Sequence, residues 1–371
     1  MNLSKFLNII EKKSKTTEYF LPINFGCRAN SAELNQLSQI LVENKYTPIK
    51  VKSAKIPSIV IVNTCAITQK GEYESLSKIR GLRKKYGKST ILVTGCANLE
   101  KISKDKNTHV FNNDEKEAIL ETEHKTYTSK VKDKFTNDKK YLLKIQSGCR
   151  QFCSYCTVPY QRNYEFSLTP SVVISTVKKA IKDGYKELII TGVNLNEYKY
   201  KLSNLVEKIL EETIIKTISF GSVPINCVDE KFTMLYKNTE YRKRLSSNLH
   251  IPIQSGSDKV LKLMNRPYTK LEIIDAFSSL RKAYPEIIFG TDVIVGFPGE
   301  SKQDFQETVS LCQKLSFNKI HTFRYSRRPN TLADYMYKKY PKIPSLEIKE
   351  RSKIIRSIDQ TILPSHQKPQ S

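Results

Sequence analysis

Three cysteines lie within eight residues of this chain, directly after an apolar stretch that predicts a strand. Cys149, Cys153 and Cys156 have the spacing C-x3-C-x2-C and follow Tyr141–Gln146. Cysteine thiolates hold iron–sulfur clusters, and a four-iron cube usually takes four of them. Three closely spaced thiolates leave one iron open to a small molecule, which for this spacing is expected to be S-adenosylmethionine (SAM). The loop therefore predicts a SAM-binding 4Fe-4S cluster and radical chemistry.

Two other uses of cysteine fit this chain less well. A structural zinc site usually takes four nitrogen or sulfur ligands, often from two CxxC pairs. Neither a second pair nor a nearby histidine accompanies the loop. Disulfide frameworks are typical of short secreted chains, whereas this chain has 371 residues and its Met1–Lys15 segment lacks a signal-peptide pattern. The iron–sulfur interpretation is therefore preferred.

Charge and hydrophobicity restrict the partners of the chain. Lysine and arginine number 62 against 37 aspartates and glutamates, a formal net charge of +25. Phosphate contacts by such side chains dominate nucleic-acid affinity, so nucleic acid is an expected partner. A biased genome composition, which enriches lysine along the whole chain, is the competing explanation for the positive charge. No apolar run approaches the ~20 residues of a membrane helix, so we expect a cytoplasmic protein without membrane contact.

The segment before the cysteine loop alternates strands and helices. Ser58–Asn63 and Thr90–Thr94 are β-branched runs that predict buried strands, and the basic stretch Glu72–Tyr86 between them predicts a helix. This order predicts a parallel sheet. A cysteine follows each of three strands or apolar runs, namely Cys27, Cys65 and Cys96. Ligands bind at the carboxyl ends of parallel strands, so these thiols are expected to converge and could hold a second cluster; buried core cysteines are the alternative.

A polar linker at residues 121–139 is expected to separate an N-terminal domain, residues 17–120, from a second domain at residues 140–360, with a tail at 361–371. The second domain alternates strands and helices again. Its candidate strands are Tyr141–Gln146, Glu187–Thr191, Ile215–Phe220, Leu249–Gln254, Ile287–Val295 and Lys319–Tyr325. Six βα units predict an incomplete (β/α)6 barrel with its active site at the carboxyl ends of the strands. The predicted fold class is α/β, a parallel-sheet domain followed by this barrel.

Blocks of sequence between Phe20 and Ile358 resemble the radical-SAM methylthiotransferases. These blocks are Gly26-Cys27 with Asn30, Val62–Cys65, Val93–Cys96, Cys149–Cys156 with Val158–Tyr160, Thr191–Asn194, His250–Ser257, Met264–Arg266 with Tyr268-Thr269, and Thr291–Glu300. Asn63–Thr68 and Tyr325–Pro329 look most like the branch that modifies N6-threonylcarbamoyladenosine in tRNA. The isopentenyladenosine branch and the ribosomal-protein branch are the alternatives.

The resemblance implies two 4Fe-4S clusters and SAM as cofactors. It assigns Cys149, Cys153 and Cys156 to the SAM-binding cluster. It assigns Cys27, Cys65 and Cys96 to an auxiliary cluster that carries the sulfur to be inserted. The implied activity adds a methylthio group to carbon two of the modified adenosine at tRNA position 37. The implied partners are the anticodon loop and an electron donor such as flavodoxin or ferredoxin. A non-catalytic iron–sulfur RNA-binding protein is the alternative of another class.

The same blocks suggest further contacts, although no catalytic residue is assigned. The expected SAM-pocket residues are Thr191, Asn194, Gln254, Ser255, Asp292 and Glu300. Glu300 alternatively caps the helix that starts near Lys302. The arginines expected to contact tRNA phosphates are Arg324, Arg327 and Arg328. Two further cysteines, Cys227 and Cys312, are not expected to be ligands.

The chain departs from the family pattern in three places. Arg162-Asn163 stands where arginine-glycine is expected, and Ser167-Leu168 stands where serine-arginine is expected. The family usually ends in a small β-barrel RNA-binding (TRAM) domain. This sequence ends at Ser371, so we expect that domain to be lacking and RNA to be held by the two predicted domains or by another protein.

Overall fold

The computed structural model describes residues 3–11, 18–66, 68–102, 106–123 and 140–361. The chain divides into two compact units, which are described separately. The first unit comprises residues 1–149, 157–193 and 212–215, and the second comprises residues 150–156, 194–211 and 216–371. Within the described residues, no helix combines the length and apolar character that a bilayer crossing requires.

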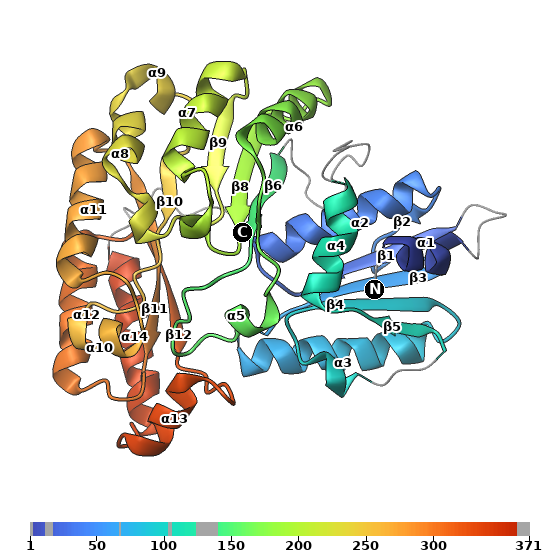
Figure 1. Cartoon of the computed structure of the whole chain (residues 1–371). Coiled ribbons are helices and arrows are strands. Elements are labelled where there is room, and N and C mark those ends of the chain that lie inside the picture. Colours follow the sequence, from blue (N-terminus) through green and yellow to red (C-terminus); the bar gives the residue numbers. More distant parts are fainter. Residues whose placement is uncertain (1–2, 12–17, 67, 103–105, 124–139, 362–371) are drawn as a thin grey trace. The chain divides into compact units, whose positions relative to one another are not determined.

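A five-stranded parallel sheet forms the centre of the first unit, with the strand order β2-β1-β3-β4-β5 (Figure 1). Its strands are β1 Tyr19–Asn24, β2 Thr47–Pro48, β3 Ile59–Thr64, β4 Thr90–Gly95 and β5 Thr108–Val110. All residues of β3 and β4 are buried. Parallel strands covered on both faces read as continuous apolar runs, which is why the sequence predicted these two strands.

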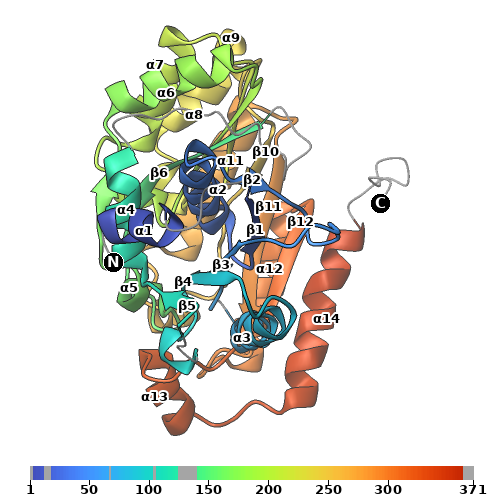
Figure 2. The ribbon, with the colours of Figure 1, turned by 90° about the vertical axis from the view of Figure 1, so that its right-hand side faces the viewer.

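Helices cover both faces of this sheet (Figure 2). They are α1 Leu3–Glu11, α2 Arg28–Glu43, α3 Gln69–Lys85 and α4 Asn113–Glu123. Ile59 and Ile61 of β3 pack with residues of α1, α2 and α4, whereas Val60 and Val62 pack with residues of α3. This alternation follows from the two-residue period of a strand. The predicted linker at 121–139 falls largely outside the described residues.

The first unit also contains β6 Lys140–Ser147, β7 Phe166–Ser167, β8 Glu187–Gly192, α5 Val158–Gln161 and α6 Pro170–Lys182. Strand β6 pairs in parallel with β8 and antiparallel with β7. Leu143 and Ile145 of β6 are fully buried. The predicted first strand of the second domain, Tyr141–Gln146, therefore lies within β6.

The second unit continues the alternation of strands and helices, with β9 at Thr217–Phe220. Strands β10 Asn248–His250, β11 Ile288–Val295 and β12 Lys319–Arg324 form a parallel three-stranded sheet. The helices are α7 Leu202–Glu212, α8 Glu230–Lys237, α9 Thr239–Arg242, α10 Asp258–Leu263, α11 Lys270–Ala283, α12 Lys302–Leu315, α13 Leu332–Lys339 and α14 Ser345–Thr361. The predicted α/β class is confirmed.

The largest difference from a predicted strand is at β10. The predicted strand Leu249–Gln254 ends as β10 at His250. Pro252 has no N–H to donate to a ladder, and Gln254 has a positive φ of 66°. Parallel pairing resumes only as an isolated bridge between Gln254 and Val293.

Candidate functional site

Three cysteines of the first unit follow neighbouring strands of the five-stranded sheet. Cys27 follows β1, Cys65 follows β3 and Cys96 follows β4. The register pairs Thr64 with Gly95, so Cys65 and Cys96 each come directly after a paired residue. All three cysteines therefore leave the sheet at its carboxyl edge, where parallel α/β sheets bind ligands.

Hydrogen bonds of buried polar side chains tie the three loops together. Asn30 Nδ2 donates to the carbonyl of Thr64 at 2.9 Å, and Asn63 Nδ2 donates to the carbonyl of Asn30 at 2.8 Å. Thr64 Oγ1 donates to the carbonyl of Thr94 at 2.8 Å and accepts from the amide of Ala97 at 3.1 Å. The three cysteine loops are thus fixed relative to one another by the side chains of Asn30, Asn63 and Thr64, which bond to backbone groups of the neighbouring loops.

A glycine is required beside two of these cysteines. A Cβ at Gly26 would lie 1.8 Å from Nδ2 of Asn30, the side chain that links the first two loops. Gly95 has a φ of +109°, and a Cβ there would lie 2.4 Å from the amide nitrogen of Thr64. Glycine is the residue that permits such close backbone approach.

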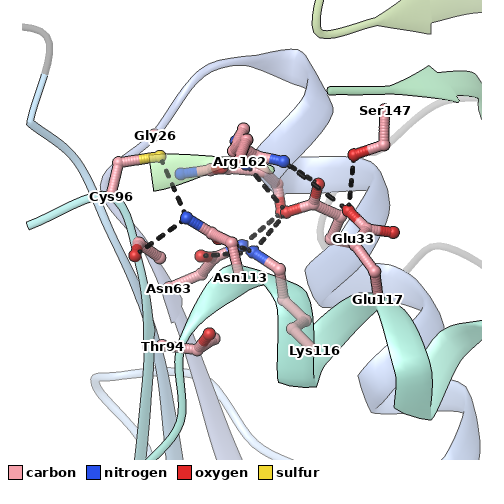
Figure 3. A network of polar contacts seen from close by, with 12 residues as sticks. Gly26, Glu33, Asn63, Thr94, Cys96, Asn113, Lys116, Glu117, Ser147 and Arg162 are labelled. Carbon is pink, nitrogen blue, oxygen red and sulfur yellow. Dashed lines mark hydrogen bonds and ion pairs between the residues drawn. The ribbon is translucent and has the colours of Figure 1, made fainter. Parts of the chain in front are cut away.

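A network of buried charges lies behind these loops (Figure 3). Its members are Glu33 of α2, Lys116 and Glu117 of α4, Lys144 of β6, and Arg162, which follows α5. Glu33 pairs with Lys116 at 2.5 Å, with Lys144 at 2.8 Å and with Arg162 at 2.6 Å. Glu117 pairs with Lys144. Burial of charges is tolerated only with such pairing and hydrogen bonding.

The network reaches the cysteine loops and the end of β6. Arg162 donates to Oδ1 of Asn30 at 2.5 Å. Ser147, two residues before Cys149, donates to Glu117 Oε1 at 2.8 Å. Asn113 Nδ2 lies 3.7 Å from Cys96 Sγ and donates to the carbonyl of Gly95 at 3.2 Å. The sequence named Arg162 only beside the departure at Asn163 and predicted none of these partners.

The cations determine the ionisation of Glu33. Burial alone would raise the pKa of this carboxyl, but the charges of Arg162, Lys116 and Lys144 outweigh burial and hold the pKa well below its ordinary value. A carboxyl whose pKa is lower in the folded state stabilises that state above the ordinary value and loses this contribution as the pH falls below it.

Glu33→Gln is therefore expected to lower the free energy of unfolding at neutral pH by about 3–5 kcal/mol, because it leaves buried cations uncompensated. The difference from wild type should shrink as the pH falls from 4.5, the ordinary pKa of the group, towards the lower folded value. Urea unfolding at several pH values measures it. Glu240→Gln, at an exposed surface pair with Lys243, is the control and should change stability by less than about 1 kcal/mol. A difference that stays constant with pH would contradict this account.

The C-x3-C-x2-C loop begins at Gly148, whose φ of +86° turns the chain away from β6. Residues 150–156 belong to the second unit and are anchored there. The amide of Arg150 donates to both carboxylate oxygens of Glu197 at 2.9 Å. Asn265 Nδ2 donates to the carbonyls of Gln151 and Phe152 at 3.1 and 3.0 Å. Contacts to two other segments of the second unit therefore shape the loop.

One sulfur of this loop has a cationic donor. Arg266 Nη1 lies 3.1 Å from Cys153 Sγ, and its Nε donates to the hydroxyl of Tyr268 at 2.8 Å. A guanidinium is a charged hydrogen-bond donor to this sulfur, and the thiolate is the form of cysteine that binds metal. Arg266 and Tyr268 belong to the sequence block Met264–Thr269, for which the sequence predicted no role.

The chemistry of the cysteines fits iron–sulfur ligation. None of the eight cysteines forms a disulfide. Cys96 and Cys153 each have a nitrogen donor near the sulfur. Cys227 and Cys312 are buried, and burial raises the pKa of each thiol to about 12. These two thiols stay protonated at neutral pH, and that they are not ligands stays a prediction.

The expected SAM-pocket residues differ in their surroundings. Asn194 Nδ2 donates to Glu197 at 2.9 Å, and Thr191 is buried in β8. Ser255 Oγ is buried 3.3 Å from Thr308 Oγ1 of α12. Glu300 is buried, accepts from the amide of Gly296 at 2.7 Å and pairs with Arg351 of α14 at 2.5 Å. The alternative that Glu300 caps α12 is wrong, because Ser301 is the N-cap residue in a capping box with Asp304.

Asp292 lies between two histidines on the sheet of the second unit. His250 Nε2 is 3.1 Å from Asp292 Oδ1, and His321 Nδ1 is 3.4 Å from the same oxygen. The three ligand atoms lie within 4.8 Å of one another, a combination able to hold a divalent cation or a polar ligand. The sequence did not predict His321 as a site residue. The strand register places it on β12 opposite Asp292 of β11.

The three arginines expected to contact RNA lie in different environments. Arg324 is exposed at the end of β12. Arg327 forms an ion pair with Asp334 of α13, and Arg328 is buried. Of these three arginines, Arg324 and Arg327 therefore present their charge at the surface.

Comparisons with known proteins cover nearly the whole chain. The radical SAM superfamily matches residues 143–312, and the uncharacterized protein family UPF0004 matches residues 20–116. Threonylcarbamoyladenosine tRNA methylthiotransferase MtaB of Chlamydia pneumoniae is 30% identical over 354 residues, 92% of this chain and 82% of the relative. tRNA-2-methylthio-N(6)-dimethylallyladenosine synthase of Clostridium botulinum (strain Loch Maree / Type A3) is 32% identical over 350 residues, 85% of this chain and 76% of the relative.

A solved structure supports the fold. The radical S-adenosylmethionine methyltransferase TsrM of Kitasatospora setae, with cobalamin and a 4Fe-4S cluster bound, has a TM-score of 0.64 to this chain. The two sequences are 11% identical, and the likeness covers 86% of this chain and 77% of that chain. At this identity the comparison concerns the fold alone, which is that of radical SAM proteins.

Proposed function

Because this chain belongs to the radical SAM methylthiotransferase family, we propose that it adds a methylthio group to carbon two of N6-threonylcarbamoyladenosine at position 37 of tRNA. The family assignment confirms the resemblance inferred from the sequence, and it makes the chain a transferase whose family uses a 4Fe-4S cluster and SAM. The choice of modified nucleoside is supported by the relative from Chlamydia pneumoniae, which matches 92% of this chain.

The observation that carries this proposal is the second set of cysteines. SAM cleavage requires only the cluster of the C-x3-C-x2-C loop. Cys27, Cys65 and Cys96 follow three neighbouring strands at one sheet edge, and the side chains of Asn30 and Thr64 connect their loops. Such a trio supports an auxiliary 4Fe-4S cluster, which gives a chain of this family a place to hold sulfur for transfer.

The bound groups supply the electron transfer, the sulfur and the methyl group, while the chain holds and orients them. Cys149, Cys153 and Cys156 would ligate one cluster, and Arg266 donates to the sulfur of Cys153. Cys27, Cys65 and Cys96 would ligate the other. We further propose that Thr191, Asn194, Gln254, Ser255, Asp292 and Glu300 line or support the SAM pocket.

The proposed tRNA contact rests on the arginines at and after the end of β12 and on the net charge of +25. Arg324→Ala is expected to weaken tRNA binding and to reduce the slope of log affinity against log salt by about one, as for a phosphate contact. Lys319→Ala, which removes an exposed cation at the other end of β12, is the matched control. Fluorescence anisotropy at several salt concentrations measures both. Equal slopes in the two variants would place the tRNA elsewhere.

The experiment that tests the function is nucleoside mass spectrometry of tRNA from a deletion strain. The strain should lose 2-methylthio-N6-threonylcarbamoyladenosine, and the wild-type chain should restore it. Restoration by a chain that carries Cys27→Ala would contradict the assigned role of the auxiliary cluster. We also place the protein in the cytoplasm, with flavodoxin or ferredoxin as its electron donor.

A second candidate function keeps the chemistry and changes the substrate. The relative from Clostridium botulinum, named for dimethylallyladenosine, is 32% identical and so no more distant than the first. Loss of 2-methylthio-isopentenyladenosine from the deletion strain would identify this branch instead. A mass change in a ribosomal protein would identify the third branch, and unchanged tRNA and ribosomal protein would favour a non-catalytic RNA-binding role.

A further inference from the structure

The buried charges of the first unit do not cancel. Glu33, Lys116, Glu117, Lys144 and Arg162 each expose at most 3% of the side chain, and three of them are cations against two carboxylates. Lys116 Nζ has three acceptors, namely Glu33 at 2.5 Å, Asn113 at 2.7 Å and Asn63 at 3.5 Å, as a protonated amine requires. One positive charge therefore remains uncompensated within this group of five residues.

One cation of this group, Lys116, is connected to the sulfur of Cys96 through the side chain of Asn113. Asn113 accepts from Lys116 through Oδ1 at 2.7 Å, and its Nδ2 lies 2.9 Å from the carbonyl of Gln161, 3.2 Å from the carbonyl of Gly95 and 3.7 Å from Cys96 Sγ (Figure 3). An amide polarised by a cation is a stronger donor, because hydrogen bonds in a chain reinforce one another. Burial lowers the pKa of Lys116, the charge of Glu33 opposes this effect, and the charge of Arg162 adds to it. The side chain of Asn113 thus links Lys116 to Cys96.

A cluster held at Cys96 would carry a charge that matches this excess. A four-iron core with two positive charges and three thiolate ligands carries one negative charge, equal and opposite to the excess of the network. A one-electron reduction adds a further negative charge at the cluster, and nearby positive charge favours that state. Hydrogen bonds to the sulfurs and the local charge are recognised determinants of iron–sulfur potentials.

We propose that Lys116, acting through Asn113, is a positioning residue that raises the reduction potential of the iron–sulfur cluster at Cys96, and that Glu33 limits this effect. This inference rests on the auxiliary cluster of the proposed function. It assigns to the buried network a role in the chemistry of the cluster beyond the stabilisation of the fold.

The test compares variants whose effects should have opposite signs. All are made in a full-length chain that carries Cys149→Ala, Cys153→Ala and Cys156→Ala, so that the reconstituted protein holds only the auxiliary cluster. Lys116→Met removes the excess cation and is expected to shift the potential to more negative values. Glu33→Gln increases the excess and is expected to shift it to more positive values. The double variant should return close to the starting potential.

Potentiometric titration followed by electron paramagnetic resonance, with iron counted per chain, gives the readout. Lys144→Met is the matched control, since it removes a buried cation that also pairs with Glu33 but makes no contact with Asn113 in any described hydrogen bond. Its shift should be negative and smaller than that of Lys116→Met. A role in packing alone would not produce shifts of opposite sign in two variants of the same ion pair.

Three results would overturn the inference. Equal potentials in all variants would remove the tuning role and leave the auxiliary cluster in place. Loss of iron from both single variants, with the parent chain loaded, would assign the network to cluster assembly alone. Absence of iron from the parent chain itself would contradict the auxiliary cluster, and with it the proposed function, so the two failures are distinguishable.

Discussion

Cys149→Ala is expected to reduce the formation of 5′-deoxyadenosine from SAM to the level of a sample without enzyme. Three thiolates hold three irons of a cube, and the loss of one opens a second iron and destabilises the cluster. The backbone of the loop should keep its shape, since Glu197 and Asn265 hold it through the amide of Arg150 and the carbonyls of Gln151 and Phe152. The measured loss therefore reports on the ligand.

Anaerobic reconstitution, chemical reduction and chromatography of the products check this expectation. About half of the bound iron should also be lost, on the assumption of two independent cubes with three cysteine ligands each. Cys312→Ala is the control. Its thiol lies on the buried face of α12 and stays protonated, so iron binding and SAM cleavage should both persist. If Cys149→Ala kept full cleavage, the loop would not be the SAM-binding site.

Much of the fold could be predicted because buried parallel strands carry a strong local signal. Ser58–Asn63 and Thr90–Thr94 are apolar on both faces, and the structure places β3 and β4 over nearly the same residues. The signal failed where backbone chemistry interrupts a strand, as Pro252 does after β10. Helix α1 was not predicted, although Phe6 and Ile10 are fully buried. Its nine residues make too few turns for the helical repeat of apolar residues to be recognised.

The charged network could not be predicted because its members lie far apart in the sequence. Glu33, Lys116 and Arg162 are ordinary surface residue types, and only the packing of α2, α4 and the segment after α5 brings them together. Lys144 offered a weak signal, a charge between Leu143 and Ile145 in an apolar run. The two-residue period of a strand would place such a charge on an exposed face, whereas the structure buries it against Glu33 and Glu117.

Cys27→Ala is expected to separate the two activities of the protein. The variant should still form 5′-deoxyadenosine from SAM, because the C-x3-C-x2-C loop is untouched, but methylthiolated tRNA should fall to background and about half of the iron should be lost. Cys27 suits this test because it is exposed and precedes α2 without a side-chain capping hydrogen bond, so alanine removes no stabilising contact at the cap.

The same reaction mixtures provide both readouts, 5′-deoxyadenosine and the tRNA nucleosides. Cys227→Ala, at a buried thiol of high pKa, controls for the loss of a cysteine as such and should retain both products. Full methylthiolation by Cys27→Ala would remove this cysteine from sulfur transfer. Loss of both products, with the fold intact by circular dichroism, would show that the two sets of cysteines depend on each other. In that case the sheet edge of the first unit would support SAM cleavage itself, and the division of labour between the two clusters would have to be abandoned.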